Sequence, residues 1–331
     1  MDNQKTPFNA VLDSLLDEKK EFPRRHLQLF SDLGALELKT VMDVWPRLSP
    51  SRKLSLLEGL ETLAEGVTLV SFDDFARAIL NDPDSVVRGR AIRLLSECED
   101  PNLIPTFIDI MKFDFDAPTR AEAATILSLF VDLGELEEIP EDLYHEVEDA
   151  LLAVANGTDE SRVRRRALES LGYSSRTEVQ TLIDSAYRRE DPAWKASALF
   201  AMGRSADTRW DDEVLQSLIS ENETVQEAAV AAAGQLSIKA ASPILLNLLT
   251  DAEEGEVTNS VIWSLSQVGG EDVRTYLENL LDQTEDEEQI EFLEEALENL
   301  SFTEDLDRFE LMALDPEFLD DLEEVDEEKE E

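Results

Sequence analysis

The sequence predicts an all-α protein, a right-handed α-solenoid of about seven to eight stacked helical hairpins. Two observations indicate this fold class. One pattern recurs along most of the 331 residues at a nearly constant spacing, as expected when one structural unit is repeated. A second apolar segment lies between successive copies, so each repeat has two amphipathic helices. One hairpin cannot bury both of its faces, and it therefore stacks on its neighbours.

The clearest copy of the repeat runs from Asp159 to Gly172. It has a turn signal, a basic first turn, small and apolar residues at helical spacing, and a closing glycine. The polar position of this copy is Arg164. In chain order, equivalent positions fall at 88, 120, 164, 195, 226 and 258, with steps of 32, 44, 31, 31 and 32 residues. Weaker copies at Lys53 and Leu293 extend the array in both directions.

The repeat divides the chain into three segments. Residues 1–48 are predicted to form an N-terminal helical cap, because their apolar faces are out of phase with the repeat and a solenoid needs a capped end. Residues 49–302 form the repeat array. Residues 303–331 are predicted to be an acidic, largely disordered C-terminal tail, because carboxylates dominate this segment.

The step of 44 residues places an insertion near Asp132 to Asp142. Its proline and its acidic run predict a loop. An insertion on one face of a repeat array is either a binding loop or a tolerated surface excursion, because added loop length costs little entropy.

Three copies combine an aspartate in the turn with a basic residue in the helix that follows: Asp82-Pro83 with Val87-Arg88, Asp159 with Val163-Arg164, and Asp191-Pro192 with Lys195. In these residues the pattern resembles the HEAT-repeat family, in particular the short-repeat type also found in phycobilisome lyase-like proteins. The resemblance covers roughly residues 50–300. It implies a solenoid in which the second helix of each hairpin lines the concave side. It implies no single activity, because the family includes scaffolds, transport receptors and a few enzymes.

Basic residues recur at one position of the repeat. In the family this position usually hydrogen-bonds to an Asp of the same or a neighbouring repeat, so the resemblance implies a structural ladder. Contact with a partner is the alternative role. The ladder positions are Arg88, Arg120, Arg164 and Lys195.

A second set of positions shares the outward face of each second helix, and by the resemblance it forms the concave wall. Its cations and aromatic rings suit an acidic, partly hydrophobic peptide. The alternative for Phe200 and Trp263 is packing against the next hairpin. The candidate partner-binding stripe comprises Arg90, Arg93, Arg166, Glu169, Tyr173, Phe200, Arg204 and Trp263.

Charge and composition exclude several classes of function. The net charge of -47 opposes nucleic-acid binding, which depends on Lys and Arg at the phosphates. No apolar run reaches about 18 residues, and no signal peptide is present. We therefore expect a cytoplasmic, monomeric protein without a membrane span. Residues 158–209 form a basic segment in the middle of the chain, with ten Lys or Arg against eight Asp or Glu. The acidic tail either docks on this segment or only keeps the protein in solution.

The sequence offers no set of residues for chemistry. Deoxyhypusine hydroxylase resembles this fold and uses several His-Glu pairs to hold two irons. This chain has two His, one Cys and the single pair His145-Glu146. We expect no catalytic residues, no metal site and no cofactor.

The predicted function is therefore a non-enzymatic protein–protein interaction scaffold that binds a peptide or protein along the concave face. The alternative is a bilin-lyase-like enzyme or an accessory factor that acts on a modified protein, by analogy with the repeat type.

Overall fold

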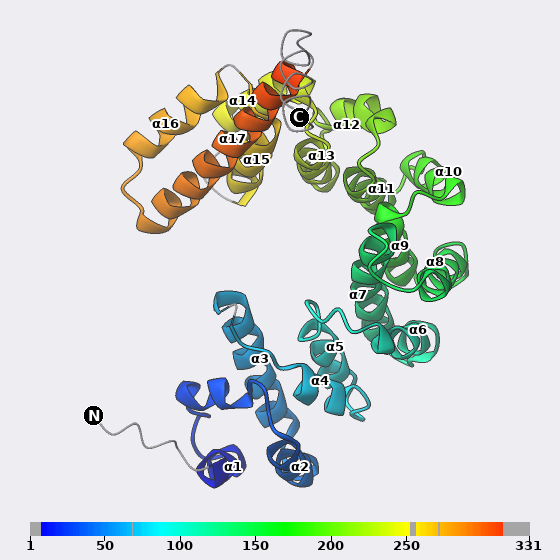
Figure 1. The fold of residues 1–331 in the computed structure, drawn as a ribbon, viewed down its shortest axis with the longest axis vertical. Coiled ribbons are helices and arrows are strands. Elements are labelled where there is room, and N and C mark those ends of the chain that lie inside the picture. The colour runs from blue at the N-terminus through cyan, green and yellow to red at the C-terminus, as the bar shows by residue number, and fades with distance from the viewer. Residues whose placement is uncertain (1–7, 68, 252–255, 271, 314–331) are drawn as a thin grey trace, which may run out of the picture. The chain divides into compact units, whose positions relative to one another are not determined.

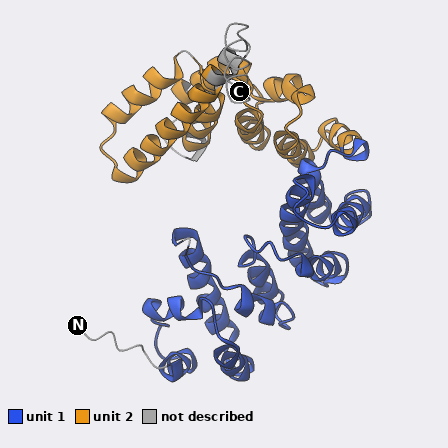
Figure 2. Cartoon of the chain, in the orientation of Figure 1, with its two compact units in different colours: residues 1–179 blue, residues 180–331 orange. Residues whose placement is uncertain are grey.

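A computed structural model describes residues 8–67, 69–251, 256–270 and 272–313. All regular secondary structure in these ranges is helical (Figure 1). The chain divides into two compact units, residues 1–179 and residues 180–331 (Figure 2). Within each unit, helical hairpins stack on one another. The predicted all-α fold of stacked hairpins is confirmed.

The first unit begins with short helices that pack on α3 (Pro50–Gly66) and α4 (Asp73–Ile79). An aromatic cluster joins them to α4, because the rings of Phe30 and Trp45 each lie 5.3 Å from the ring of Phe75. The short helices are α1 (Phe8–Leu16), η1 (Arg24–Phe30), α2 (Ala35–Val44) and η2 (Trp45–Arg47).

Hairpins follow from α4 onward. The second helices pack against one another in the order α3, α5, α7 and α9, and each first helix packs against its own second helix. A small residue lies three positions after the ladder arginine in α5, α7 and α9. These residues, Ala91, Ala123 and Ala167, are fully buried, which allows close approach between the helices. The remaining elements are α5 (Ser85–Arg93), η3 (Pro101–Leu103), α6 (Ile104–Phe113), α7 (Ala117–Glu135), α8 (Glu141–Ala155), α9 (Ser161–Ser170) and η4 (Leu171–Tyr173).

The insertion predicted as a loop at Asp132 to Asp142 is a loop in its middle, and both of its ends are helical. Helix α7 continues to Glu135 and α8 starts at Glu141, which leaves only residues 136–140 between them. The buried side chains of Phe130, Val131 and Leu133 continue the apolar face of α7. This periodicity outweighs the acidic character of the segment, and the extra residues lengthen the hairpin.

The second unit repeats the arrangement. Helix α10 (Thr177–Tyr187) spans the boundary between the units. The second helices α11, α13, α15 and α17 pack in that order. We call the exposed side of the second helices in either unit the second-helix face. The elements are α11 (Pro192–Arg204), η5 (Thr208–Trp210), α12 (Asp211–Ser217), α13 (Glu223–Gln235), η6 (Lys239–Ala241), α14 (Ser242–Asp251), α15 (Glu256–Val268), α16 (Val273–Gln283) and α17 (Glu287–Ala313).

The tail boundary predicted at residue 302 falls inside α17, which continues to Ala313. Thr303 donates a hydrogen bond to the carbonyl of Ser266 at 2.9 Å, and Glu304 accepts one from Arg274 at 2.7 Å. The first part of the predicted tail is therefore helix packed on α15 and α16. Residues 314–331 lie outside the described residues.

Ion pairs join successive hairpins of the first unit. Lys53 Nζ lies 2.6 Å from Asp82 Oδ2. Arg88 donates two hydrogen bonds to the carboxylate of Asp114, both at 2.7 Å. Arg120 does the same to Asp159, at 2.9 and 2.6 Å. Each basic side chain reaches the turn that precedes the next second helix.

Each of these aspartates also shapes its own turn. Asp82, for example, accepts a hydrogen bond from the backbone N–H of Asp84 at 2.9 Å, and Asp114 accepts one from Asp116 at 2.9 Å. Arg88 in turn donates to the carbonyl of Asp82 at 2.9 Å. The ladder therefore connects three successive turns through one hydrogen-bonded network.

Contacts are also described for the other two ladder positions. In the first unit, Arg164 Nε donates to the carbonyl of Ala155 at 3.1 Å. In the second unit, Lys195 Nζ lies 4.9 Å from the centre of the Tyr187 ring.

The ladder carboxylates have lowered pKa values. Burial raises the pKa of Asp114, but hydrogen bonds, first of all from Arg88, lower it by more, so it lies below its ordinary value of 3.8. The same balance, with Lys53 as the main donor, lowers the pKa of Asp82. The hydrogen bonds from Arg120 lower the pKa of Asp159. The folded state therefore favours the charged form of all three carboxyls.

Replacing Asp114 by Asn should reduce the free energy of unfolding by roughly 3 kcal/mol, because it leaves Arg88 without its charged partner at a largely buried site. Chemical denaturation followed by circular dichroism measures this. The matched control is Asp109→Asn on the exposed side of α6, which should change stability by less than about 0.5 kcal/mol. Equal effects of the two changes would contradict a stabilising ladder.

The stability difference between the native chain and Asp114→Asn should depend on pH. A lowered folded-state pKa stabilises the protein above the unfolded pKa and loses that effect as pH falls through the folded value. The difference should be constant near pH 7 and shrink below about pH 4. Denaturation of both proteins between pH 7 and pH 2.5 measures it, and a difference that does not change in the acid range would contradict the assignment.

Candidate partner-binding surface

Two arginines of the predicted stripe link helices α3, α5 and α7 of the first unit. Arg90 lies 2.7 Å from Glu58 and also pairs with Glu61. Arg93 lies 3.1 Å from Glu61 and 3.3 Å from Glu122. Both arginines therefore face carboxylates of neighbouring repeats.

The stripe residues of α9 form a second cluster. Arg166 pairs with Glu169, whose side chain is only 8% exposed. Tyr173 follows in η4 and is half-buried. Three basic residues of the stripe therefore have acidic partners within the first unit, namely Arg90, Arg93 and Arg166. The reason for expecting an acidic ligand there is correspondingly weaker.

In the second unit the stripe residues contact aromatic rings. The guanidinium of Arg204 lies 4.4 Å from the centre of the Phe200 ring on the same helix. Trp263 on α15 is half-buried, and its ring centre lies 6.4 Å from that of Phe292 on α17. The Arg204 pair and the Trp263 pair are separate features of this unit.

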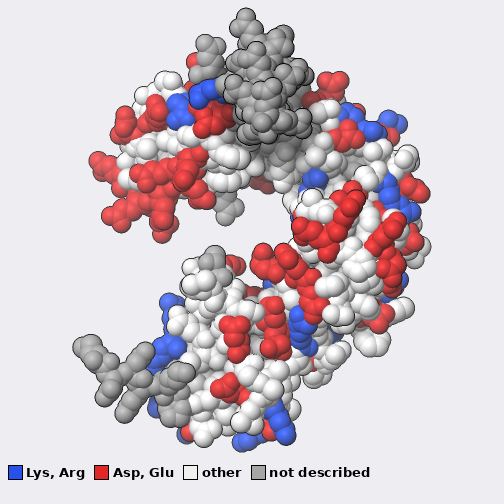
Figure 3. All heavy atoms as spheres, viewed as in Figure 1, with Lys and Arg blue, Asp and Glu red and all other residues white. Residues whose placement is uncertain are grey.

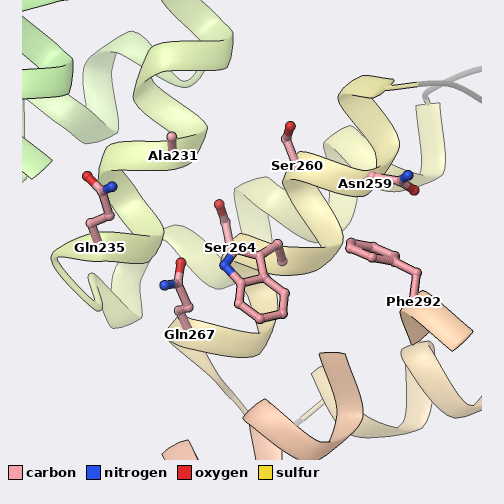
Figure 4. Close-up of a pocket in the computed structure, with 8 residues that line it drawn as sticks. Ala231, Gln235, Asn259, Ser260, Ser264, Gln267 and Phe292 are labelled. Atoms are coloured by element: carbon pink, nitrogen blue, oxygen red, sulfur yellow. The ribbon is translucent and has the colours of Figure 1, made fainter. Parts of the chain in front are cut away.

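A pocket surrounds Trp263 on the second-helix face of the second unit. Its volume is about 330 Å³. Figure 4 shows Gln235 on α13 and Gln267 on α15 at one side, and Phe292 reaching from α17 toward α15 at the other. The lining residues are Ala231, Gln235, Asn259, Ser260, Trp263, Ser264, Gln267 and Phe292.

The pocket is a direct product of the repeat. Ala231 and Trp263, Gln235 and Gln267, and Ser260 and Phe292 are each 32 residues apart. They lie at the same repeat positions as predicted stripe residues of α9 and η4. Ser260 and Phe292 correspond to Arg166, Ala231 and Trp263 to Glu169, and Gln235 and Gln267 to Tyr173. Phe292 was not among the predicted binding residues, because the predicted stripe ended at Trp263 on α15. In the weak copy at Leu293, this leucine is equivalent to Ala167 of the clearest copy, so Phe292 is equivalent to the stripe residue Arg166.

Close packing fixes the glutamines that form one wall. A Cβ atom at Gly203 would lie 2.2 Å from Gln235 Oε1, and one at Gly234 would lie 2.4 Å from Gln267 Oε1. The missing side chains therefore make room for the amides. Farther along the same row, Asn299 donates to Ser266 Oγ at 2.9 Å.

The chemistry of the pocket is that of a binding site. Its lining groups are amides, hydroxyls, a methyl group and two aromatic rings. None of these titrates near neutral pH, whereas general acid–base catalysis needs a group that does. The lining offers hydrogen bonds and an apolar contact surface.

The His145-Glu146 pair does not act as a unit. His145 instead contacts Glu148 at 3.0 Å, and this hydrogen bond raises the pKa of His145. Glu148 is fully buried and also accepts from Ser174 Oγ at 2.5 Å. This cluster joins α8 to the turn after η4. Among the described residues, no group of three or more His, Cys, Asp or Glu is placed to hold a metal ion. Nor is any helix of the described ranges long and apolar enough to cross a membrane.

Solved structures resemble the chain at low identity. Escherichia coli YibA is 18% identical, with 74% of this chain and 96% of that chain covered and a TM-score of 0.33. Kap95p, from a study of its binding to RanGDP, is 13% identical, with 91% and 40% covered and a TM-score of 0.39. Human deoxyhypusine hydroxylase is 16% identical, with 79% and 95% covered and a TM-score of 0.34. These likenesses concern the fold alone.

No curated protein matches the chain. A family model for HEAT repeats matches residues 74–172 and 211–298. The match covers more than half of the chain, and the structure has the helical hairpins that the sequence pattern predicts. The protein therefore belongs to the HEAT-repeat family.

Proposed function

We propose that this protein is a non-enzymatic interaction scaffold that binds a segment of a partner protein on its second-helix face. The observation that supports this most is the pocket around Trp263. Three successive repeats contribute equivalent positions to it, and its lining combines two aromatic rings with amides and hydroxyls.

The composition of the pocket suits a peptide. Aromatic side chains, Trp above all, dominate the binding energy of protein interfaces when they lie at the centre of a contact. The amides of Gln235, Gln267 and Asn259 have both donors and acceptors, which match the N–H and C=O groups of a peptide backbone. A volume of about 330 Å³ lies at the lower end of the range for ligand pockets and suits one or two side chains.

The alternative function, a bilin-lyase-like enzyme or accessory factor, is supported only by the repeat type. No contact or cluster described above favours it. Purified protein that carries a chromophore would support this alternative, and its absorbance spectrum tests it.

A photo-crosslinking experiment tests the scaffold function. A benzophenone amino acid replaces Ala231 inside the pocket or, as a control, the exposed Asp282 on the first helix α16. Each protein is irradiated in native lysate, and crosslinked proteins are identified by mass spectrometry. We expect one defined partner from position 231 and none from position 282.

Trp263→Ala should weaken capture of that partner by about 2 kcal/mol or more of binding free energy, as for an interface hot spot. Phe113→Ala removes an aromatic ring that is 72% exposed on the first helix α6 of the other unit and should leave capture unchanged. Circular dichroism confirms that both variants keep their helicity. The proposal fails if position 231 captures no protein, or if Trp263→Ala binds the partner as tightly as the native chain does.

A further inference from the structure

We infer that the pocket formed by Trp263 and Phe292 holds an arginine side chain from a basic segment of the partner. This inference rests on the proposed function and specifies its ligand. It also reverses the charge expected from the sequence, which predicted an acidic peptide. The argument uses the rings, the charges around them and the amides beside them.

The two rings form an open pair. Their centres lie 6.4 Å apart and their planes are inclined by 39°. The face of an aromatic ring attracts cations, most strongly for Trp, and the planar guanidinium of Arg stacks on such a face better than the ammonium of Lys does.

The second unit contains two other places where an arginine lies against an aromatic ring. Arg189 lies 3.9 Å from the centre of the Trp194 ring, and Arg204 lies 4.4 Å from that of Phe200. There the chain supplies both members of each pair. The Trp263 pocket is different, because none of its eight lining residues is basic. Its cation would come from the partner.

Carboxylates surround the pocket. On α17, Glu288 and Glu295 stand four residues before and three residues after Phe292, so they share its side of the helix. On α13, Glu227 stands four residues before Ala231 on the same side. All three glutamates are exposed. They place negative charge at the rim, while the rings and amides inside remain neutral.

The wider surface has the same sign. Helix α17 carries ten acidic residues and one basic residue, Arg308, near its far end. Figure 3 shows a dense group of Asp and Glu side chains where α16 joins α17, next to the end of α17 that carries Phe292. Together with a net charge of -47, this potential attracts basic segments and repels acidic ones.

The row of amides suits an extended peptide. Gln235, Gln267 and Asn299 repeat at 32 residues on α13, α15 and α17. Packed helices lie about 8–10 Å apart. A peptide in the extended polyproline II conformation rises about 3.1 Å per residue with three residues per turn, so every third side chain lies on the same side. Each step along the row therefore corresponds to about three residues of the bound segment. An arginine at every third residue would present its side chains at this spacing.

Two labelled peptides test the inference with the full chain. The first is Gly-Arg-Ser-Ala-Arg-Ser-Ala-Arg-Gly. The second carries citrulline, a neutral isostere, in place of each arginine. Fluorescence anisotropy at 0.15 M salt measures both. Trp263→Ala and Phe292→Ala should weaken the arginine peptide about tenfold, and Phe113→Ala on α6 should not. None of these changes alters the net charge, so general electrostatic attraction remains constant. The citrulline peptide should bind more weakly and should not respond to the variants.

A pair of double variants tests the rim charges. Glu288→Gln with Glu295→Gln should weaken the arginine peptide several-fold, because both glutamates flank Phe292. Glu287→Gln with Glu294→Gln removes the same charge from the opposite side of α17 and should have a clearly smaller effect. Equal effects would assign the binding to overall charge and overturn the inference.

The peptide and crosslinking results separate the two proposals. Arginine binding that survives loss of Trp263 overturns the cation site, while a partner crosslinked at position 231 would still support the scaffold. If neither the peptide nor a partner binds, both proposals fail.

Discussion

The close packing of each second helix on the next is the contact on which the rest of the structure depends. Small residues fill these contacts, as Ala91, Ala123 and Ala167 do in the first unit. Gly203 and Gly234 do so in the second unit, where an added Cβ would collide with the neighbouring helix. Because the hairpins stack in a constant register, residues one period apart become neighbours in space. A row of side chains on one face is then a consequence of the repeat itself.

Such rows differ in their chemistry between the two units. In the first unit, Lys53, Arg88 and Arg120 each bind the aspartate of the next turn, and Arg90 and Arg93 pair with glutamates on adjacent helices. These charges are satisfied within the chain and hold neighbouring hairpins together. In the second unit, the outward row is neutral and aromatic around Trp263, and its rim is acidic. The charges of the first unit are therefore paired between repeats, whereas the glutamates around the pocket are exposed to solvent.

The sequence predicted the parts of the structure that depend on periodicity. Buried positions such as Val163 and Ala167 followed from helical spacing, and the hairpin order followed from the constant step between copies. The loop predicted for the insertion was too long. Residues 136–140, which include Pro140, do lie between two helices, but Phe130, Val131 and Leu133 keep α7 helical to Glu135. Composition was a weaker guide there than the spacing of apolar residues.

The candidate site was only partly predictable. Trp263 was identified from its repeat position, but its neighbour Phe292 belongs to the copy beyond, where the sequence pattern is weak. The charge of the ligand was inferred from arginines counted along the stripe. A sequence does not show that Arg90 lies against Glu58 and Glu61, because those partners come from another repeat. Pairing in space decides which charges remain for a ligand, and counting along the chain does not.

The indole N–H signals of the four tryptophans give the most direct test of the arginine pocket. Trp45, Trp194 and Trp210 are at most 5% exposed, whereas Trp263 lines the pocket. In a two-dimensional ¹H–¹⁵N spectrum, with Trp263→Ala to assign the signal, adding the arginine peptide should move the Trp263 indole resonance and leave the other three in place. The citrulline peptide should move none of them. A Trp263 signal that stays fixed while the arginine peptide binds would contradict the account.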